Sequence, residues 1–223
     1  MPKSQLFAAL LLIAFASAAS AQQPPAVRIR GTIEAVDGAM LSIKSRDGAD
    51  MKVRTTDNVA VFGVAKTDLS EIKPGSYIGV TAMPEPDGTQ KAIAVHIFPE
   101  NQRGAAEGFR PWDLRANSTM TNATVAETVK GTDGQNITVK YKDGEKKVVV
   151  PPGTPIVTFV AGDKSELKPG AKVIIFGAVN AHAAALLRKE SMQSGRPIVV
   201  PDDDGTLEAN RVNVGRDGIT PPM

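Results

Sequence analysis

The sequence contains no cysteine, so it can form no disulfide bond and can carry no thiolate chemistry. It is also poor in aromatic residues, which make up 4% of the chain, and it holds 2 histidines. Because histidines are so few and cysteine is absent, a serine or cysteine hydrolase would lack its usual general base. Because disulfide bonds are absent, the stability of the folded chain must come from packed apolar cores.

An excess of charge of either sign is also missing. The chain has 26 Lys and Arg residues and 24 Asp and Glu residues, which gives a formal net charge of +2. Proteins that bind nucleic acid need concentrated lysine and arginine, and those that bind single strands also need aromatic stacking platforms. The composition therefore argues against a nucleic-acid partner.

Long apolar runs are lacking after the N-terminal segment. Residues 1–21 combine the positive Lys3, an apolar run from Leu6 to Phe15 and the small residues Ala19-Ser20-Ala21, which is the pattern of a secretory signal and its cleavage site. The alternative is a membrane anchor, but the run is shorter than the ~20 apolar residues of a spanning helix. We predict a signal peptide over 1–21, a periplasmic or secreted mature protein, and no membrane span after cleavage.

One stretch of the chain occurs twice. Asp68-Leu-Ser-Glu-Ile-Lys-Pro-Gly75 returns as Asp163-Lys-Ser-Glu-Leu-Lys-Pro-Gly170. In each copy the aspartate can cap a single helical turn, Ile72 or Leu167 can plug a core, and Lys-Pro-Gly ends the turn before a strand. The duplication predicts two modules of the same construction.

The segments around this turn have the pattern of β-strands. Residues 27–34 alternate between apolar and polar, and Asp-Gly turns separate the short runs that follow. Val59 to Val64, before the turn, is predicted as a separate strand, and it matches Thr154 to Phe159 in the second copy. Such strands, with one helical turn before the last pair, suit a small closed barrel. We predict an all-β chain of two tandem, small OB-like closed β-barrels, each with one short helical turn.

The predicted modules have a linker between them and an insertion in the second. The insertion is Ala-rich and has high helix propensity, so we expect a short helix or an extended hairpin there. The C-terminal residues are rich in glycine and proline, and we expect them to be loosely held. The predicted boundaries are a signal peptide at 1–21, a lead-in at 22–26, a first β-barrel module at 27–98, a Trp-containing linker at 99–118, a second β-barrel module at 119–214 with an insertion at 180–201, and a tail at 215–223.

The linker supplies the candidate binding residues, because it holds the only tryptophan of the chain among alternating charges. Large aromatic side chains commonly anchor contacts between domains. One interpretation is therefore that they dock the two barrels against each other. The other is that the linker is a recognition loop for a partner, since loops often carry function. The candidate binding residues are Arg103, Glu107, Phe109, Arg110, Trp112 and Asp113.

Metal binding is an alternative that rests on His96 and Met120, because imidazole and thioether groups suit transition metals. His96 falls on the polar side of an alternating strand and matches Asn213 in the other copy. A surface polar residue is therefore the simpler interpretation of His96, and His182 stands alone in the insertion. Metal sites need several convergent ligands. We predict no cofactor.

The chain has a Gly-x-Ile/Val opening at Gly31, and the Leu/Ile-Lys-Pro-Gly turn and an Asp-Gly-Thr-x-x-Ala hairpin occur in both modules. They resemble a bacterial family of small exported β-barrel domains of unknown function. The order of His96-x-Phe-Pro-Glu100, Glu107-Gly-x-Arg-Pro-Trp-Asp113 and a terminal Pro-Pro-Met resembles relatives that are often labelled metal transporter permeases. A permease needs several spanning helices, and no later stretch of this chain is apolar enough to form one.

Three classes of function follow from these patterns. The first is an exported, non-catalytic binding or scaffold protein whose partner is a protein or small ligand in the periplasm. The alternative is a periplasmic protein that handles transition metals. The third is an enzyme that uses Glu100 and Glu107 as a carboxylate pair, one of which would need a raised pKa. We predict the first class and no enzymatic activity.

Overall fold

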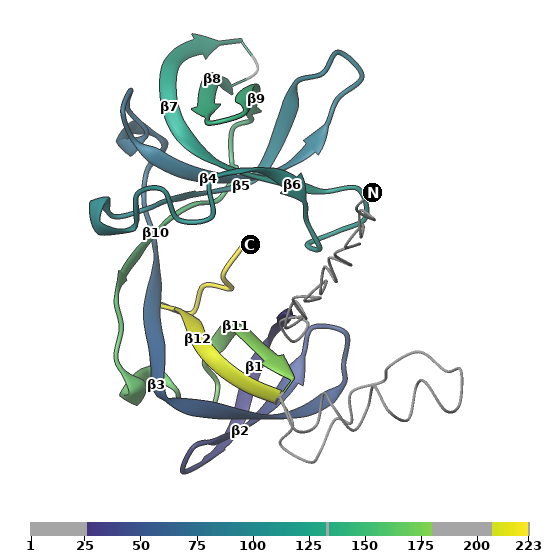
Figure 1. The fold of residues 1–223 in the computed structure, drawn as a ribbon, viewed down its shortest axis with the longest axis vertical. Helices are drawn as coiled ribbons and strands as arrows, with labels where there is room; N and C mark the ends of the chain where they lie inside the picture. Colours follow the sequence, from purple (N-terminus) through teal and green to yellow (C-terminus); the bar gives the residue numbers. More distant parts are fainter. Residues whose placement is uncertain (1–25, 133, 180–206, 223) are drawn as a thin grey trace, which may run out of the picture.

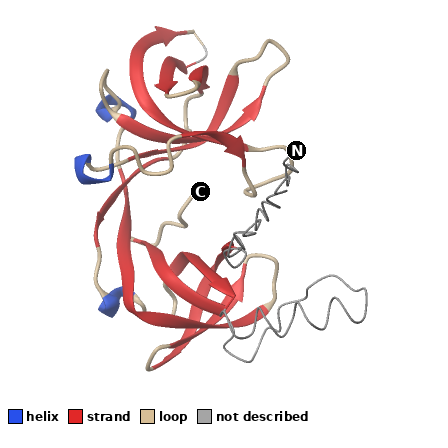
Figure 2. Cartoon of the chain, in the orientation of Figure 1, coloured by secondary structure: helices blue, strands red, loops and turns tan. Residues whose placement is uncertain are grey.

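The computed structural model describes residues 26–132, 134–179 and 207–222, and the regular secondary structure of these residues is almost entirely β-strand (Figures 1 and 2). The all-β prediction is confirmed. The predicted signal peptide, the insertion at 180–201 with His182, and most of the lead-in lie outside the described residues. Within the described part of the chain, no helix is long and apolar enough to cross a membrane.

The described residues form twelve strands and three single-turn 3-10 helices. The first strands are β1 (Ala26–Asp37), β2 (Met40–Ser45), β3 (Asp50–Lys66), β4 (Tyr77–Pro84), β5 (Gln90–Ile97) and β6 (Gly108–Pro111). The later strands are β7 (Thr119–Gly131), β8 (Gly134–Tyr141), β9 (Gly144–Val150), β10 (Ile156–Ala161), β11 (Lys172–Val179) and β12 (Leu207–Gly215). The helical turns are η1 (Leu69–Glu71), η2 (Glu100–Gln102) and η3 (Lys164–Glu166).

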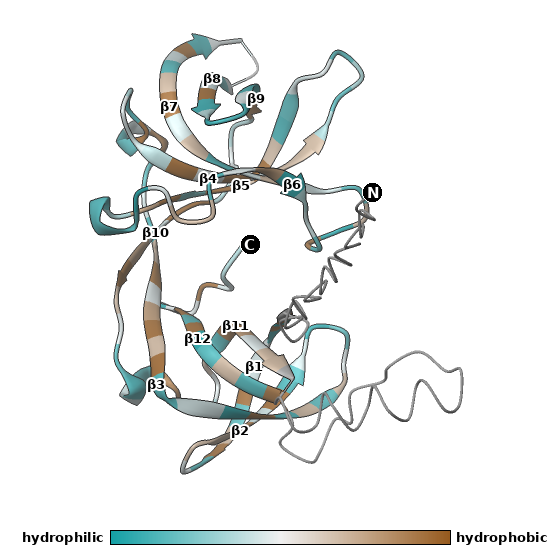
Figure 3. Ribbon diagram, viewed as in Figure 1, coloured by the Kyte–Doolittle hydropathy of each residue, from teal (hydrophilic) through white to brown (hydrophobic). Residues whose placement is uncertain are grey.

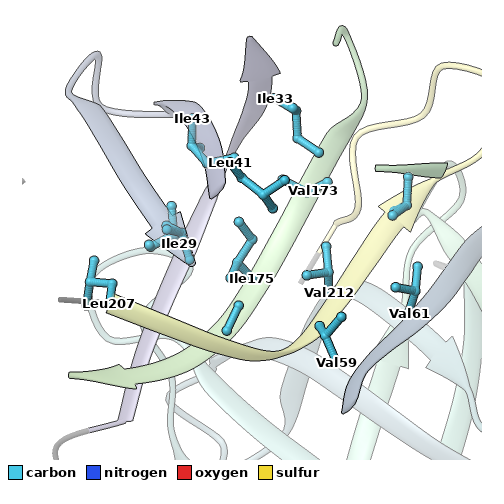
Figure 4. Close-up of a cluster of buried hydrophobic side chains, with 13 residues drawn as sticks. Ile29, Ile33, Leu41, Ile43, Val59, Val61, Val173, Ile175, Leu207 and Val212 are labelled. Atoms are coloured by element: carbon cyan, nitrogen blue, oxygen red, sulfur yellow. The ribbon is translucent and has the colours of Figure 1, made fainter. Parts of the chain in front are cut away.

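Five strands close a barrel that forms the lower lobe in Figure 1. β1 pairs with β2 and β11, β2 with β3, and β11 with β12, all antiparallel. A parallel pairing of β3 with β12 completes the circuit. Its interior holds a cluster of buried apolar side chains that includes Ile33, Leu41 and Ile175 (Figure 4). Because side chains alternate across a strand, one face of each strand feeds this core.

A second circuit of pairings forms the upper lobe. β4 pairs with β5 and β7, and β8 pairs with β7 and β9, all antiparallel. β9 returns to β5 through a parallel pairing. The buried residues of this lobe include Ile78, Val80 and Val139. Figure 3 shows the corresponding alternation of apolar and polar positions along β7 and β12.

The strand pairing does not follow the predicted module boundaries. The first three strands of the 27–98 segment close with β11 and β12, and its last two close with β7, β8 and β9. The reason lies in β3, which is 17 residues long. The sequence pattern predicted a separate strand at Val59 to Val64, but β3 continues through it and carries the chain from one lobe to the other (Figure 1).

The second copy also carries the chain from one lobe to the other, but its strand is interrupted. β9 ends at Val150, Pro151 and Pro152 follow, and β10 begins at Ile156. Proline has no N–H to donate to a ladder, so it interrupts a central strand. β10 pairs antiparallel with the end of β3 and parallel with β5, which joins the two circuits into one sheet.

The repeated helical turns plug the cores as predicted. Ile72 is buried in the core of the upper lobe, and Leu167 packs against the core of the lower lobe. The capping differs between the copies. Asp163 accepts a hydrogen bond from the Ser165 N–H within a capping box, whereas Asp68 makes no side-chain capping bond. The side chain that fills the core is therefore the shared feature of the two turns.

The C-terminal residues are held in place, contrary to the expectation of a loose tail. The backbone N–H of Arg216 donates to the carbonyl of Val64, and the Arg216 side chain forms an ion pair with Glu166. Pro221 is buried. The segment after β12 thus runs back into the space between the lobes (Figure 1).

Candidate functional site

A pocket of about 330 Å³ lies between the two lobes. The lower lobe contributes Arg28 from β1, Phe176 from β11 and Arg211 from β12, and the upper lobe contributes His96 from β5 and Asn122 from β7. β10 and the linker supply further lining residues, among them Phe159, Arg110 and Trp112. Because both lobes build its walls, the pocket exists only in the assembled fold.

His96 reaches the pocket because of its position on β5. Its neighbour Val95 points into the core of the upper lobe, and alternation places His96 on the opposite face. This face is covered, so the residue is 3% exposed. The imidazole lies edge-on to Phe98 and Phe159, with ring centroids 4.6 and 5.3 Å away. The prediction that His96 is a surface residue is therefore wrong, because β5 packs on both faces.

Gly79 on β4 makes room for the imidazole. It pairs in register with His96 on one side and with Asn122 of β7 on the other. A Cβ atom at position 79 would overlap the imidazole atoms Cε1 and Nε2 and would lie 2.7 Å from Oδ1 of Asn122. The side chains of His96 and Asn122 therefore occupy the space above Gly79. The neighbouring strands β5, β4 and β7 bring both side chains to the same side of the pocket.

Several polar atoms at this site are buried and have no hydrogen-bond partner among the residues that the structure describes. They are Nδ1 of His96, Oδ1 of Asn122 and Nε1 of Trp112. Asn122 is nevertheless oriented, because its Nδ2 donates to the carbonyl of Ala105 over 3.0 Å. Buried polar groups are normally satisfied, and an unsatisfied one costs free energy. These atoms are consequently candidates for contacts with a bound molecule.

Burial keeps the imidazole neutral. Desolvation is the main cause that lowers the pKa of His96 to about 3, and the positive charges of Arg211 and Arg110 lower it further. A neutral imidazole offers one donor and one acceptor nitrogen. His96 can therefore form hydrogen bonds with a ligand, but it is a weak base at neutral pH.

The guanidinium group of Arg211 is enclosed by phenylalanine rings. Its Cζ lies 4.5 Å from the ring centroid of Phe62, 5.1 Å from that of Phe159 and 5.7 Å from that of Phe176. Its Nε donates to Oδ1 of Asn213 over 2.9 Å. Burial lowers the pKa of Arg211. This cation is thus held in a fixed orientation by cation–π contacts and one hydrogen bond.

Arg110 is a second partly buried cation at the pocket. Its Nη1 donates to the carbonyl of Ala106 over 2.7 Å. Burial lowers the pKa of Arg110, and the charge of Arg28 adds to this effect. Within the described residues, neither Arg110 nor Arg211 lies within ion-pair distance of a carboxylate. The pocket therefore carries positive charge that is not neutralised by these residues.

The remaining linker candidates lie away from the pocket. Arg103 forms an ion pair with Glu100 and donates to the carbonyl of Gly75. Glu107 accepts a hydrogen bond from the Lys142 N–H. Phe109 is 39% exposed, with the Lys146 ammonium 4.4 Å from its ring centroid. Of the six linker residues proposed from sequence, the structure places Arg110 and Trp112 in the pocket lining.

The linker also docks the lobes against each other, and Asp113 is central to this contact. Its carboxylate binds Nε of Arg28 at 3.0 Å and Nη2 of Arg30 at 2.8 Å. Desolvation alone would raise the pKa of Asp113, but the hydrogen bonds from Arg30 and Arg28 outweigh it and the pKa is lowered. The Arg28 guanidinium lies 3.9 Å from the Trp112 ring centroid. These contacts support the docking interpretation of the linker.

The residues proposed for metal binding do meet in this pocket, since His96 and Met120 both line it. The Met120 sulfur accepts a weak contact from the Thr81 hydroxyl at 4.0 Å. No group of three or more His, Cys, Asp and Glu side chains gathers in the described parts of the chain. The donor set here is thus one imidazole and one thioether, fewer than a closed metal site needs.

The carboxylate pair considered for catalysis does not have the expected electrostatics. The hydrogen bond from Arg103 is the main cause that lowers the pKa of Glu100. A general acid needs the opposite shift. Glu107 is engaged with the backbone of Lys142. This arrangement gives no support to an acid and base pair at these two residues.

Reasoning from the sequence missed Arg28, Asn122, Phe159, Phe176 and Arg211. All five lie on strands, where an isolated polar or aromatic residue looks like part of a surface or a core. One available signal was the match between His96 and Asn213, which places a polar residue at the same strand position in both copies. Asn213 is also buried, and it orients Arg211.

Comparisons of this chain with protein-family models, with curated proteins and with solved structures found no match.

Proposed function

We propose that this chain is an exported, non-catalytic binding protein that holds a small ligand in the pocket between its lobes. The observation that carries the proposal is the set of buried polar atoms on His96, Asn122 and Trp112 that have no hydrogen-bond partner among the described residues and lie around one pocket. Ligand pockets characteristically combine apolar walls with a few placed polar groups. The apolar walls here come from Phe98, Phe159 and Phe176.

The proposal includes an interpretation of the fold as two OB-like barrels that exchange their last two strands. Each circuit consists of a three-stranded meander, a helical turn that plugs the core, and two closing strands. In each, the last strand pairs in parallel with the third. This connectivity supports the interpretation of each circuit as a small OB-like barrel. Because each lobe needs strands from both copies, a site between the lobes has a rigid frame.

Export and the absence of catalysis rest on separate arguments. The pattern of residues 1–21 supports export to the periplasm or beyond. The neutral, weakly basic His96 and the lowered pKa of Glu100 support a binding role over acid–base chemistry. We therefore expect the protein to release its ligand unchanged.

Native mass spectrometry of the mature protein, purified from the periplasm under mild conditions, tests the proposal. We expect the intact chain to carry a small organic molecule that is lost under denaturing conditions. The denatured mass should also correspond to a chain that begins at Gln22. A bound transition metal would instead favour the metal-handling alternative, and a bare chain that co-purifies with a polypeptide would favour a scaffold.

A further inference from the structure

We infer that the ligand of this pocket is a small organic anion, with a carboxylate bound by Arg211 and Arg110 and a flat apolar body packed against Trp112. The inference rests on the proposed binding function and specifies the ligand class. Three kinds of observation support it: the charge of the pocket, the hydrogen-bonding capacity of its guanidinium groups, and the shape and polarity of its walls.

The charge of the pocket favours an anion. Its described lining includes Arg28, Arg110 and Arg211 but no aspartate or glutamate. Asp113 neutralises Arg28 from outside the lining. A partly buried cation loses hydration, and an anionic partner in good geometry offsets this loss. A carboxylate between Arg110 and Arg211 would supply that partner.

The two guanidinium groups also have N–H donors with no hydrogen-bond acceptor among the described residues. Arg211 uses its Nε for Asn213, and Arg110 uses its Nη1 for the carbonyl of Ala106. Within the described residues their other N–H groups make no hydrogen bond. A guanidinium fork matches the two oxygens of a carboxylate, and charge-assisted bonds of this kind are strong. The phenylalanine rings around Arg211 keep the fork oriented before any ligand binds.

The rest of the lining suits a planar, mostly apolar body. Trp112, Phe98, Phe159 and Met120 contribute aromatic rings and a thioether to the lining, and His96 and Asn122 add a few polar atoms. The volume of about 330 Å³ is at the small end of the range for ligand pockets. A body of one or two fused rings, with a single polar substituent for His96 or Asn122, fits this description.

The test compares aromatic monocarboxylates with their neutral amides on the full mature chain. The probes are benzoate, cinnamate and indole acetate, each matched with its primary amide. Calorimetric titration gives the affinity, and quenching of Trp112 fluorescence gives the location, because Trp112 is the only tryptophan of the chain. We expect at least one carboxylate to bind and quench Trp112, with its amide weaker by about 10-fold or more.

Substitutions identify the cations responsible. Arg211→Gln and Arg110→Gln should each weaken carboxylate binding by about 10- to 100-fold and leave amide binding unchanged. Arg54→Gln is the matched control, because Arg54 is exposed on β3 and lies outside the pocket lining. It removes the same charge and should have little effect. If one pocket variant fails to fold, the other variant and the comparison with the amides still test whether the pocket binds a carboxylate through its arginines.

The possible outcomes separate the two proposals. If carboxylates and amides bind equally, or if carboxylate binding survives both pocket substitutions, the inference about the anion is overturned and the binding function stands. If neither series binds and the protein also purifies without a small molecule, the proposed function and the inference both fail.

Discussion

Val64 and Phe159 lie directly opposite each other where β3 and β10 pair antiparallel. They are also matched positions of the two sequence copies, since Val59 to Val64 corresponds to Thr154 to Phe159. The two copies are therefore related at this point by a local two-fold axis. The contact resembles the isologous contact between two identical subunits of a dimer, in which the same residues of each partner meet. Both side chains are buried in the cluster between the lobes. Each copy therefore crosses to the other lobe at this point.

This crossing predicts that a cut between the copies leaves the molecule assembled. A protease site inserted between the exposed residues Arg115 and Ala116 would separate β1–β6 from β7–β12. Because β1 pairs with β11 and β4 pairs with β7, the two fragments should stay associated. Size-exclusion chromatography of the cut protein should give the elution volume of the uncut chain, and denaturant should release two fragments.

Uncut protein carrying the same inserted site is the control for this experiment. Two independent modules joined by a linker would separate after cleavage without denaturant. Separate elution of two folded fragments would therefore contradict the exchange of strands.

Local elements of this fold were predictable from sequence, but the partners of its strands were not. Period-two alternation and Asp-Gly turns identify strands such as β2, and the shared construction of the two helical turns identifies Ile72 and Leu167 as core plugs. Whether β3 reverses or continues depends on tertiary contacts. A few extended residues after Thr55 suit a loop within one barrel as well as a passage to the other. The alternation is the same in both cases, so the sequence left this choice open.

The candidate site was predictable only in part, for a related reason. Trp112 and Arg110 stand out in an irregular segment, and both line the pocket. His96 and Arg211 lie on regular strands, and each occupies the polar side of its alternation. That side is normally exposed to solvent. It is covered here by residues of the other lobe and of β10, and this packing depends on pairings between strands far apart in the sequence rather than on any local pattern.

Gly79→Ala should destabilise the protein, because the added methyl group would overlap the imidazole of His96. Overpacking of a rigid interior typically costs about 1–3 kcal/mol. The cost should fall in a His96→Ala background, where the ring that meets the methyl group is absent. A double-mutant cycle measured by urea unfolding gives this coupling. Equal costs in both backgrounds would show that the imidazole does not occupy the space above Gly79.

Asp113→Asn should weaken the contact between the linker and the lower lobe, because Asp113 holds both Arg28 and Arg30. The Asp113 side chain is 44% exposed, so solvent limits the loss of unfolding free energy to about 0.5–1 kcal/mol. Added salt should reduce the difference from wild type. Asp47→Asn is the control, since Asp47 is 87% exposed and lies 3.7 Å from its only described ion-pair partner, Arg46. A control loss equal to that of Asp113→Asn would contradict the docking role.

We also expect the Asp113 carboxylate to make the unfolding free energy depend on pH in the acid range. Its pKa is lowered in the folded state, so the folded protein favours the charged form. The stabilisation is present above the ordinary aspartate pKa of 3.8 and is lost as the pH falls through the folded-state value. Asp113→Asn should remove this part of the pH dependence, which chemical unfolding at a series of acid pH values would detect.

His96 should make the protein less stable as the pH falls below 6.5, its ordinary pKa. Burial lowers the pKa of His96 to about 3 in the folded state, so between these values the unfolded chain binds a proton that the folded chain does not. Stability therefore decreases with falling pH in this window, by about 1.4 kcal/mol per pH unit from this group.

The variant His96→Asn tests this expectation, because asparagine is the residue at the matching position 213 of the second copy. The other histidine of the chain is unchanged and serves as an internal control. The substitution lowers stability at neutral pH through lost packing, so the informative quantity is the slope of unfolding free energy against pH. Urea unfolding between about pH 6.5 and pH 5 should give a shallower slope for the variant, because carboxylates titrate mainly below this range. Identical slopes would mean that His96 accepts its proton equally well in the folded protein, which would contradict the buried, neutral imidazole on which the pocket is built.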